Sequence, residues 1–474
     1  MAKNIYEEFL ELCAFEPEEI TEILPQWIKA ADHFGLTEED IRFAAEEWIP
    51  SHWDIQYQGI RKMIGAYIRE LIELSKAREY KEKGAKIIYG IIPAIITSYR
   101  AMKYSGGDQV FVSFPDALLV TVLNSFFHKA NPYLECAEEH GFTYGCRHCA
   151  LNKTRIAARW ENVIPAPDVI WSWGFNCDEG PKTDEYIQCL FDKDWRYVIS
   201  RLPHDTNFGE ADDELDDRVE FVAMEIKDGL KQIEEITGIK ITEEHMKKAL
   251  EDSNRYAFKN GMLVSLMSKA DPVPLGGSDI VHFQQPLGIP FNTGLKYLEE
   301  AIDLTIKEVR AAIKEGKGVV PKGAPKVAFY GVPVAVPWVD RMFRENGVAP
   351  TVSFNLSPSR KMLTPLRHSE PYMATAEQWL RMPMGMNMRS EADTMIQKIK
   401  DNKPDAVIMG FFDFDRWLGA QQKMAAKICE EETGVPHYYI EGDWWEDRDY
   451  SPEALRTRIE SISQILKLRK LSQA

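Results

Sequence analysis

The sequence lacks several features that would place the protein in a membrane or among nucleotide-dependent enzymes. Its longest apolar runs, such as residues 87–96, fall far short of the roughly 20 residues that span a bilayer. The N-terminal residues contain no apolar core of a signal peptide, so we expect a soluble, cytoplasmic protein. Neither GxxxxGK[ST] nor a GxGxxG after a strand occurs, which argues against an ATPase or a nicotinamide enzyme.

Basic residues are also fewer than acidic residues. The 474 residues include 57 Lys and Arg against 74 Asp and Glu, which gives a formal net charge of −17. Such a surface repels phosphate backbones and anionic lipids, so we expect no nucleic-acid partner and no membrane partner. The length predicts two or three domains with well-buried cores.

Cysteine is scarce outside one stretch of the chain. Of the seven cysteines, Cys13 and Cys429 are the only ones outside residues 136–189, and we expect both to be small core residues. The stretch itself holds Cys136, Cys146, Cys149, Cys177 and Cys189. In a reducing compartment, clustered cysteines are more often metal ligands or catalytic groups than disulfides.

Hydrophobic periodicity divides the chain into four segments. Residues 1–84 are predicted to be helical, residues 85–205 to form a first α/β domain, residues 206–324 to be helical, and residues 325–474 to form a second α/β domain with a C-terminal helix. Strands are expected near residues 86–90, 110–113, 168–172, 327–333, 405–410 and 437–441. The fold class is therefore α/β, with two strand-helix domains whose parallel sheets gather ligands at the carboxyl ends of their strands.

Two breaks in the helical segments are also predicted. Pro50 is expected to stop a helix of the N-terminal segment. A helix that begins after Thr242 is expected to end at Gly261.

Cys146, Cys149 and Cys177 are the leading candidates for chemistry. Soft thiolates suit iron–sulfur clusters and zinc, and Cys177 comes just after a predicted buried strand. A zinc ribbon would need a second CxxC, which is absent. A dithiol redox pair of Cys146 and Cys149 is an alternative, although it leaves Cys177 unexplained. Packed core cysteines are another.

Other polar residues give weaker signals. His204 follows a Leu-Pro pair in a predicted loop, and Asp413 and Asp415 follow a predicted strand. Either group could take part in chemistry, but hydrogen-bonded loop residues are the commoner explanation. Trp171 and Trp173 are expected in the core or in a pocket wall.

From about residue 85 to residue 470, the order of features resembles the D-component subunits of 2-hydroxyacyl-CoA dehydratases and the related benzoyl-CoA reductase subunits. Residues 167–170 leading to Cys177 and Asp178 resemble the family's strand and Cys-Asp turn, and Cys146 or Cys149 resembles its upstream ligand. The later landmarks are Asn254-Arg255 and residues 439–443 followed by 456–460, and the last of these is the most specific.

The resemblance implies two α/β domains that hold a [4Fe-4S] cluster through three cysteines. It also implies a homologous second subunit, an ATP-dependent iron–sulfur activator that supplies low-potential electrons, and an acyl-CoA substrate. An added electron would turn the thioester into a ketyl radical anion that expels the β-hydroxyl group as water, or it would reduce an aromatic ring.

One departure from the family pattern concerns the third ligand. The family's third cysteine is expected near residues 411–416, where this chain reads Phe-Phe-Asp-Phe-Asp-Arg. We expect Cys146, Cys149 and Cys177 to hold the cluster instead, with Cys136 and Cys189 as substitutes and Asp413 or Asp415 as less favoured iron ligands. The alternative is a divergent non-catalytic partner subunit, with or without structural zinc.

Overall fold

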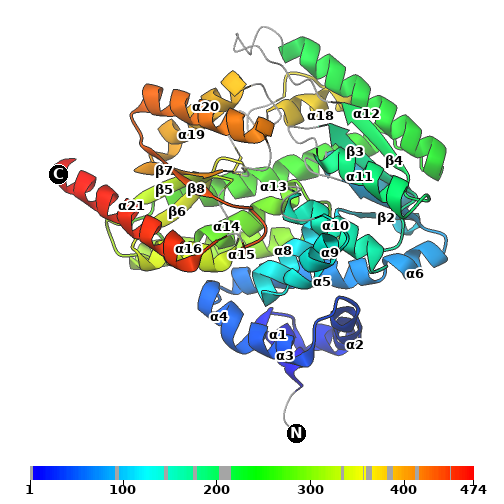
Figure 1. Cartoon of the computed structure of the whole chain (residues 1–474), viewed down its shortest axis with the longest axis horizontal. Helices are drawn as coiled ribbons and strands as arrows, with labels where there is room; N and C mark the ends of the chain where they lie inside the picture. Colours follow the sequence, from blue (N-terminus) through cyan, green and yellow to red (C-terminus); the bar gives the residue numbers. More distant parts are fainter. Residues whose placement is uncertain are drawn as a thin grey trace.

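Two four-stranded parallel sheets lie side by side in the protein, with helices around them (Figure 1). The computed structural model describes residues 4–90, 96–142, 148–174, 179–201, 215–331, 336–355, 357–358, 366–381, 388–411, 416–448 and 450–473. The predicted α/β class is confirmed.

The first sheet has the strand order β2-β1-β3-β4, and all three neighbouring pairs are parallel. Its strands are β1 (Lys86–Gly90), β2 (Val110–Ser113), β3 (Val169–Gly174) and β4 (Tyr197–Arg201). On β1, Ile88 lies opposite Val112 of β2 and Val169 of β3. The next strand in the sequence, β2, lies on one side of β1, and β3 lies on its other side. The direction in which strands are added to the sheet therefore reverses between β1 and β3. Ligands of open parallel sheets bind at this point, outside the carboxyl ends of the strands.

The second sheet repeats this arrangement with the order β6-β5-β7-β8. Its strands are β5 (Lys326–Tyr330), β6 (Ala349–Ser353), β7 (Ala406–Phe411) and β8 (His437–Glu441). The two sheets therefore have matching positions: residues 175–178 follow β3 as residues 412–415 follow β7. Cys177 belongs to the first of these segments, and Asp413 and Asp415 belong to the second.

Helices cover the faces of both sheets. Those within the first unit are α7 (Ile96–Gly106), a 3₁₀ turn at Gly107–Gln109, α8 (Pro115–Phe127), α9 (Asn131–Glu139), α10 (Ala150–Trp160) and α11 (Glu179–Leu190). Those within the second are α16 (Pro337–Glu345), α19 (Met388–Asn402), α20 (Arg416–Thr433) and α21 (Pro452–Gln473). Helix α18 (Pro371–Leu380) lies between β6 and β7 in the sequence but packs on α12 and α13, in the hydrophobic cluster of the first sheet. With both faces covered, strands such as β2 are buried along their whole length, as parallel sheets usually are.

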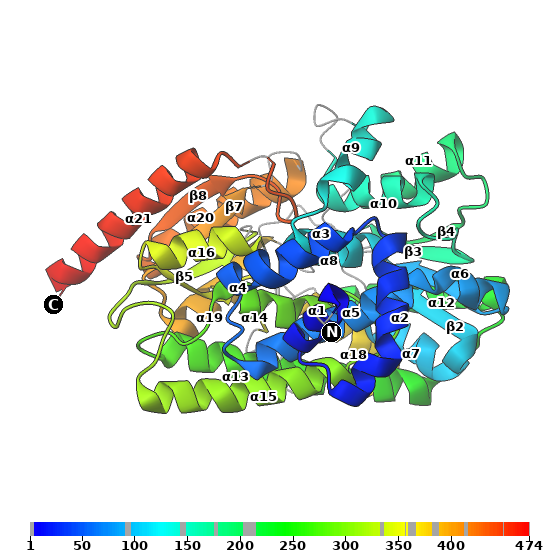
Figure 2. The same ribbon diagram turned by 90° about the horizontal axis from the view of Figure 1, so that it is seen from below.

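The helices between the two sheets join the units. They are α12 (Leu215–Thr237), α13 (Glu243–Lys269), α14 (Gly277–Gln284), a 3₁₀ turn at Gln285–Leu287, and α15 (Lys296–Glu315). Helix α13 packs on α7 of the first unit and on β6 and α19 of the second, so it runs past both sheets (Figure 2).

The predicted end of α13 at Gly261 is wrong, because the helix continues to Lys269. Leu263, Val264 and Met267 beyond the glycine are buried against the core. Their burial outweighs the cost of about 1 kcal/mol that an interior glycine carries. The predicted start is confirmed, since the Thr242 side chain accepts a hydrogen bond from the His245 N–H.

The N-terminal segment forms a helical layer at one end of the molecule (Figure 1). It contains α1 (Ile5–Leu12), α2 (Pro17–His33), α3 (Glu38–Phe43), a π-helical turn at Ala44–Trp48, α4 (Ile49–His52), α5 (Gln58–Ser75) and α6 (Ala77–Glu82). Pro50 does not stop a helix as predicted, because it lies in the first turn of α4, where its missing N–H has no intrahelical role.

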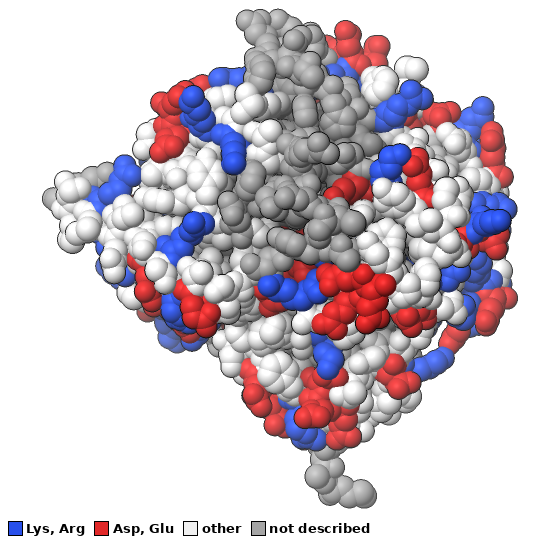
Figure 3. All heavy atoms as spheres, in the orientation of Figure 1, with Lys and Arg blue, Asp and Glu red and all other residues white. Residues whose placement is uncertain are grey.

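The other local expectations concern the core and the surface. Cys13 and Cys429 are buried, as are Trp171 and Trp173, which confirms their predicted core positions. Acidic and basic side chains are interspersed over the described part of the face in Figure 3. Among the described residues, no helix combines the length and the apolar character needed to cross a bilayer.

A buried carboxylate ties the N-terminal layer to the middle segment. Glu70 on α5 accepts hydrogen bonds from the backbone N–H groups of Asn292 (2.6 Å) and Thr293 (3.0 Å) and from the Thr293 hydroxyl (2.7 Å). Burial is the main cause that raises the pKa of Glu70 to about 7, although these hydrogen bonds act in the opposite direction.

This pKa predicts a pH-dependent contribution to stability. Between the unfolded value of 4.5 and the folded value of about 7, the folded state binds the Glu70 proton more tightly, so its contribution to the free energy of unfolding falls as pH rises. Relative to Glu70→Gln, which cannot titrate there, the wild type should lose about 2–3 kcal/mol over this window. Urea unfolding at several pH values tests this, with the exposed Glu82→Gln as the control. A difference in the free energy of unfolding between the wild type and Glu70→Gln that does not change with pH would contradict the prediction.

Candidate functional site

The candidate site is built around the first turn of α10. Cys149 is the N-cap of this helix, with extended backbone angles of φ −69° and ψ 161°. The first turn of α10 lies at the carboxyl edge of the first sheet, because the backbone N–H of Cys149 contacts Glu179, which follows the carboxyl end of β3. Cys149 is buried, with 6% of its surface exposed. One of the three predicted ligands is therefore at the edge where parallel sheets bind ligands.

Glu179 links this turn to the segment that follows β3. It is the first residue of α11, and its Oε2 accepts hydrogen bonds from the backbone N–H of Cys149 (3.3 Å) and from the side chain of Asn152 (3.2 Å). Cys177 precedes Glu179 by two residues and lies outside the described residues. The contact joins the N-terminus of α10 to the N-terminus of α11, next to two of the predicted ligands in the sequence.

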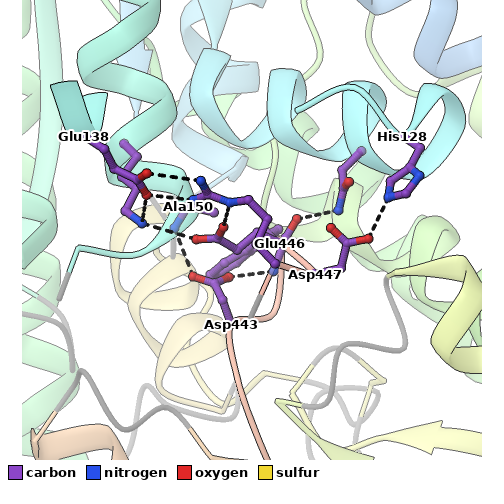
Figure 4. Close-up of polar contacts among 10 residues, drawn as sticks. His128, Glu138, Ala150, Asp443, Glu446 and Asp447 are labelled. Atoms are coloured by element: carbon purple, nitrogen blue, oxygen red, sulfur yellow. Dashed lines mark hydrogen bonds and ion pairs between the residues drawn. The ribbon is translucent and has the colours of Figure 1, made fainter. Parts of the chain in front are cut away.

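Asp443 brings the second sheet to the same helix end. It follows β8, and its Oδ2 accepts a hydrogen bond from the backbone N–H of Ala150 (3.0 Å), while its Oδ1 accepts one from the N–H of Trp445 (2.7 Å) (Figure 4). Two carboxylates, one from each unit, thus satisfy the first two backbone N–H groups of α10. Both are negative charges at a helix N-terminus, where the helix dipole favours them.

Four charged side chains fasten the two units beside this turn. Lys153 on α10 pairs with Glu138 of α9 (2.9 Å) and with Glu446 of the second unit (3.4 Å). Arg448 pairs with the same two carboxylates, at 2.8 Å from Glu138 and 2.6 Å from Glu446. We call Glu138, Lys153, Glu446 and Arg448 the ion quartet, and its formal charges sum to zero (Figure 4).

Contacts within the quartet shift the pKa values of Lys153 and Glu138 toward their charged forms. Burial acts to lower the pKa of Lys153, but Glu446 and Glu138 raise it above its usual value. Burial likewise acts to raise the pKa of Glu138, but Arg448 and Lys153 hold it below its usual value. Lys153 and Glu138 are therefore ionised at neutral pH.

Three further contacts extend the junction. The His128 Nε2 and the Trp338 Nε1 each lie 2.8 Å from the Asp447 carboxylate, and the Asn124 side chain donates a hydrogen bond to the backbone oxygen of Trp445 (2.9 Å) (Figure 4). Residues 443–448 are thus held against α8, α9 and α10 at several points.

A second buried cation on α10 points toward the first sheet. Arg155 pairs with Asp116 of α8 (2.7 Å) and Asp184 of α11 (3.2 Å), and all three side chains are buried. Burial, partly offset by Arg155, raises the pKa of Asp116 to about 6. These pairs fix α10 against α8 and α11, and so they fix the position of its first turn.

His148 adds an unsatisfied polar atom to the site. Its side chain is mostly buried, and its Nδ1 lies 3.9 Å from the Glu179 Oε2, with no hydrogen-bond partner among the described residues. Burial, and secondarily the charge of Lys153, lowers the pKa of His148, so the imidazole is neutral at pH 7. The site therefore combines a neutral imidazole, the Glu179 carboxylate and the buried Cys149.

The other predicted site residues have different outcomes. Cys146, Cys177, His204, Asp413 and Asp415 lie outside the described residues. No group of three or more potential metal ligands was found in the described part of the chain. The predicted ligand set therefore stays a prediction, with Cys149 as its one described member.

The two substitute cysteines lie away from Cys149. The Cys136 thiol donates to Glu161 (3.5 Å), which ends α10 and is separated from Cys149 by about 18 Å along the helix. Cys189 is exposed near the end of α11, about 15 Å along that helix from Glu179. Burial is the first cause that raises the pKa of Cys136 to about 11, so this thiol stays protonated at neutral pH.

The residues that build the site were mostly not identified from the sequence. Glu179 and Glu446 have no motif of their own, since acidic residues are common in this chain. Asp443 belongs to the landmark 439–443, and its role as a cap of α10 explains why that stretch carries a specific signal. Arg155 and Lys153 were not singled out in the sequence either.

The cap formed by Asp443 gives a testable prediction. Asp443→Ala removes the acceptor for two backbone N–H groups and should lower the free energy of unfolding by about 1–3 kcal/mol. Hydrogen exchange of the Ala150 and Trp445 amides should accelerate more than that of other core amides. Asp194→Ala changes an exposed aspartate in the turn before β4 and serves as the control. Unchanged protection at both amides would show that the cap does not hold the helix end.

Known proteins resemble this chain over most of its length. A family model described as 2-hydroxyglutaryl-CoA dehydratase, D-component, matches residues 111–466. The alpha subunit of (R)-2-hydroxyglutaryl-CoA dehydratase from Acidaminococcus fermentans is 23% identical over 355 residues, which are 73% of this chain and 69% of that protein. The alpha subunit of (R)-2-hydroxyisocaproyl-CoA dehydratase from Clostridioides difficile is 24% identical over 351 residues, 71% of this chain and 81% of that protein.

A more distant relative has a different activity in its name. It is one of the subunits of benzoyl-CoA reductase from Thauera aromatica, and it is 22% identical over 262 residues, 52% of this chain and 60% of that protein. The family model covers both sheets from β2 onward, including α10, Glu179 and Asp443. From this match the chain belongs to the 2-hydroxyglutaryl-CoA dehydratase D-component family.

Proposed function

We propose that this chain is the iron–sulfur subunit of a 2-hydroxyacyl-CoA dehydratase or of an aromatic acyl-CoA reductase. In this proposal Cys146, Cys149 and Cys177 hold a [4Fe-4S] cluster at the carboxyl edge of the first sheet. The relatives named above carry these two activities in their names.

The hydrogen bond from the Cys149 N–H to Glu179 is the observation that carries the proposal. It ties the turn of the Cys146–Cys149 pair to the start of α11, and only Asp178 separates Cys177 from Glu179 in the sequence. The contact therefore joins one predicted ligand, Cys149, to the helix that begins directly after Cys177 and Asp178 in the sequence.

The chemistry of the described residues fits such a group. A buried thiol at a helix N-terminus is a suitable ligand. The positive end of the helix dipole stabilises a thiolate, and a bound metal compensates the thiolate charge that burial would otherwise make unfavourable. The His148 Nδ1 adds a buried polar atom without a partner among the described residues. When bound, a [4Fe-4S] cluster supplies one-electron transfer.

The chain's own residues would position and shield this centre. Glu179 and Asp443 fix the first two backbone N–H groups of α10 and so fix the direction of the Cys149 side chain. Both carboxylates place negative charge near the ligands, and negative charge disfavours addition of an electron, which suits a low-potential centre. The neutral His148 imidazole adds no positive charge that would counteract them.

The partners follow from the same proposal. The relatives are named as subunits of larger enzymes, so we infer a homologous second subunit for this chain. The substrate would be an acyl-CoA ester, and an ATP-dependent iron–sulfur activator would deliver the low-potential electron. The absent cysteine near residues 411–416 makes the ligand set of this chain different from the one that its family resemblance implies.

Two other functions make different predictions. A zinc-stabilised partner subunit would bind one zinc ion and no sulfide. A dithiol oxidoreductase would need an accessible thiol, and burial of Cys149 disfavours that.

Anaerobic purification with iron, sulfide and zinc analysis tests the proposal. About four iron and four sulfide per chain are expected, with an electron paramagnetic resonance signal after reduction. Cys146→Ala, Cys149→Ala and Cys177→Ala should each lose most of the iron and the signal. Cys136→Ala and Cys189→Ala are matched controls from the same stretch and should keep both. Stoichiometric zinc, or iron that survives all three substitutions, would refute the assignment.

A further inference from the structure

A cavity lies beside the edge strand β2, apart from the turn that carries Cys149. It has a volume of about 620 Å³ and is bordered by α7, α13, the start of α15 and the loop before it. The edge strand β2 is separated by β1 from β3, after which Cys177 comes. Cavities of about 300–1,000 Å³ are the usual size for small-molecule sites.

Arg100 of α7 is the unusual member of the cavity wall. It is 9% exposed, and its one hydrogen bond to a described residue runs from Nη1 to the Ser253 hydroxyl (3.3 Å). No carboxylate of the described residues lies within ion-pair distance of it. Burial lowers the pKa of Arg100 to about 10, which leaves it charged at neutral pH. Buried arginines are rarely left without a charged partner, because desolvation of an unpaired charge is costly.

The nearest acidic groups of the wall are already engaged by other cations. Asp252 pairs with Arg255 (2.7 Å), and Glu299 pairs with Arg255 (2.9 Å) and Lys259 (3.4 Å). The Arg100 guanidinium therefore keeps free N–H donors toward the cavity. Lys248 also lines it, with its ammonium 4.1 Å from the centre of the Tyr104 ring.

We propose that this cavity binds a small organic molecule with a single oxyanion head, a carboxylate or a phosphate, through Arg100. A planar guanidinium offers two parallel N–H donors to such a head. Phe291 and Leu295 give the wall an apolar part that suits an uncharged body. Five cationic and four acidic residues line the cavity, so their formal charges leave one positive charge, which fits a single oxyanion head better than a polyanion.

The proposal does not depend on the iron–sulfur assignment. Arg100 and Lys248 belong to α7 and α13, and the predicted ligands belong to the segments around α10 and α11. A metal-free protein could therefore bind the molecule, and an iron-loaded protein could fail to bind it.

Isothermal titration calorimetry of the full chain tests the proposal with three probes. Butyrate offers a carboxylate with an apolar body, glycerol 3-phosphate a phosphate monoester, and pyrophosphate a polyanion. We expect butyrate or glycerol 3-phosphate to bind more tightly than pyrophosphate, and the better probe identifies the head. Tightest binding of pyrophosphate, or no binding of any probe, would overturn the proposal.

Substitutions locate the binding. Arg100→Gln should weaken the better probe about tenfold or more, as loss of a charge-assisted hydrogen bond does. Lys248→Gln changes an exposed residue, so it leaves the fold intact, and it should weaken the same probe severalfold. Arg341→Gln alters an exposed arginine on α16 and should have no effect. If Arg100→Gln does not fold, the affinity of Lys248→Gln for the better probe tests the proposal. An affinity equal to that of the wild type would overturn it.

Discussion

Two carboxylates from different sheets occupy the first backbone N–H groups of α10, and the arrangement of the site depends on them. A helix N-terminus leaves several N–H groups without intrahelical partners, and burial makes their satisfaction obligatory. Glu179 arrives from the segment after β3 and Asp443 from the segment after β8. The carboxyl edges of both sheets are therefore positioned relative to one helix end, where Cys149 is located.

Six of the eight described strands could be predicted from the sequence, and two of the four edge strands could not. The six predicted strands are present because each is a short apolar run followed by a turn. The two strands that were missed, β4 and β6, are both edge strands. In β4, exposed and buried residues alternate, and β6 contains Pro350, which only an edge strand tolerates. Weak apolar character is the physical reason that these two strands escaped detection, whereas the edge strands β2 and β8 were predicted from their apolar and aromatic residues.

The site could be predicted from the sequence only where its chemistry requires an uncommon residue type. Clustered thiols in a cysteine-poor chain drew attention to Cys149 and its neighbours. The carboxylates could not be found in this way, because Asp443 contacts a residue 293 positions away and is one of many acids in the chain. Arg100 likewise looks ordinary in the sequence, and only its burial without a carboxylate partner distinguishes it.

The ion quartet bears on how the two halves of the protein can move. Lys153 is wholly shielded from solvent and shares both of its carboxylates with Arg448. Hinge bending that parts the halves would strip a buried charge of a counter-ion, at a cost of about 3–5 kcal/mol. Rigid-body closure around a bound molecule is thus disfavoured. A change of ligand specificity in this fold would therefore come from substitution of individual residues that line the binding site, and not from a change in domain motion.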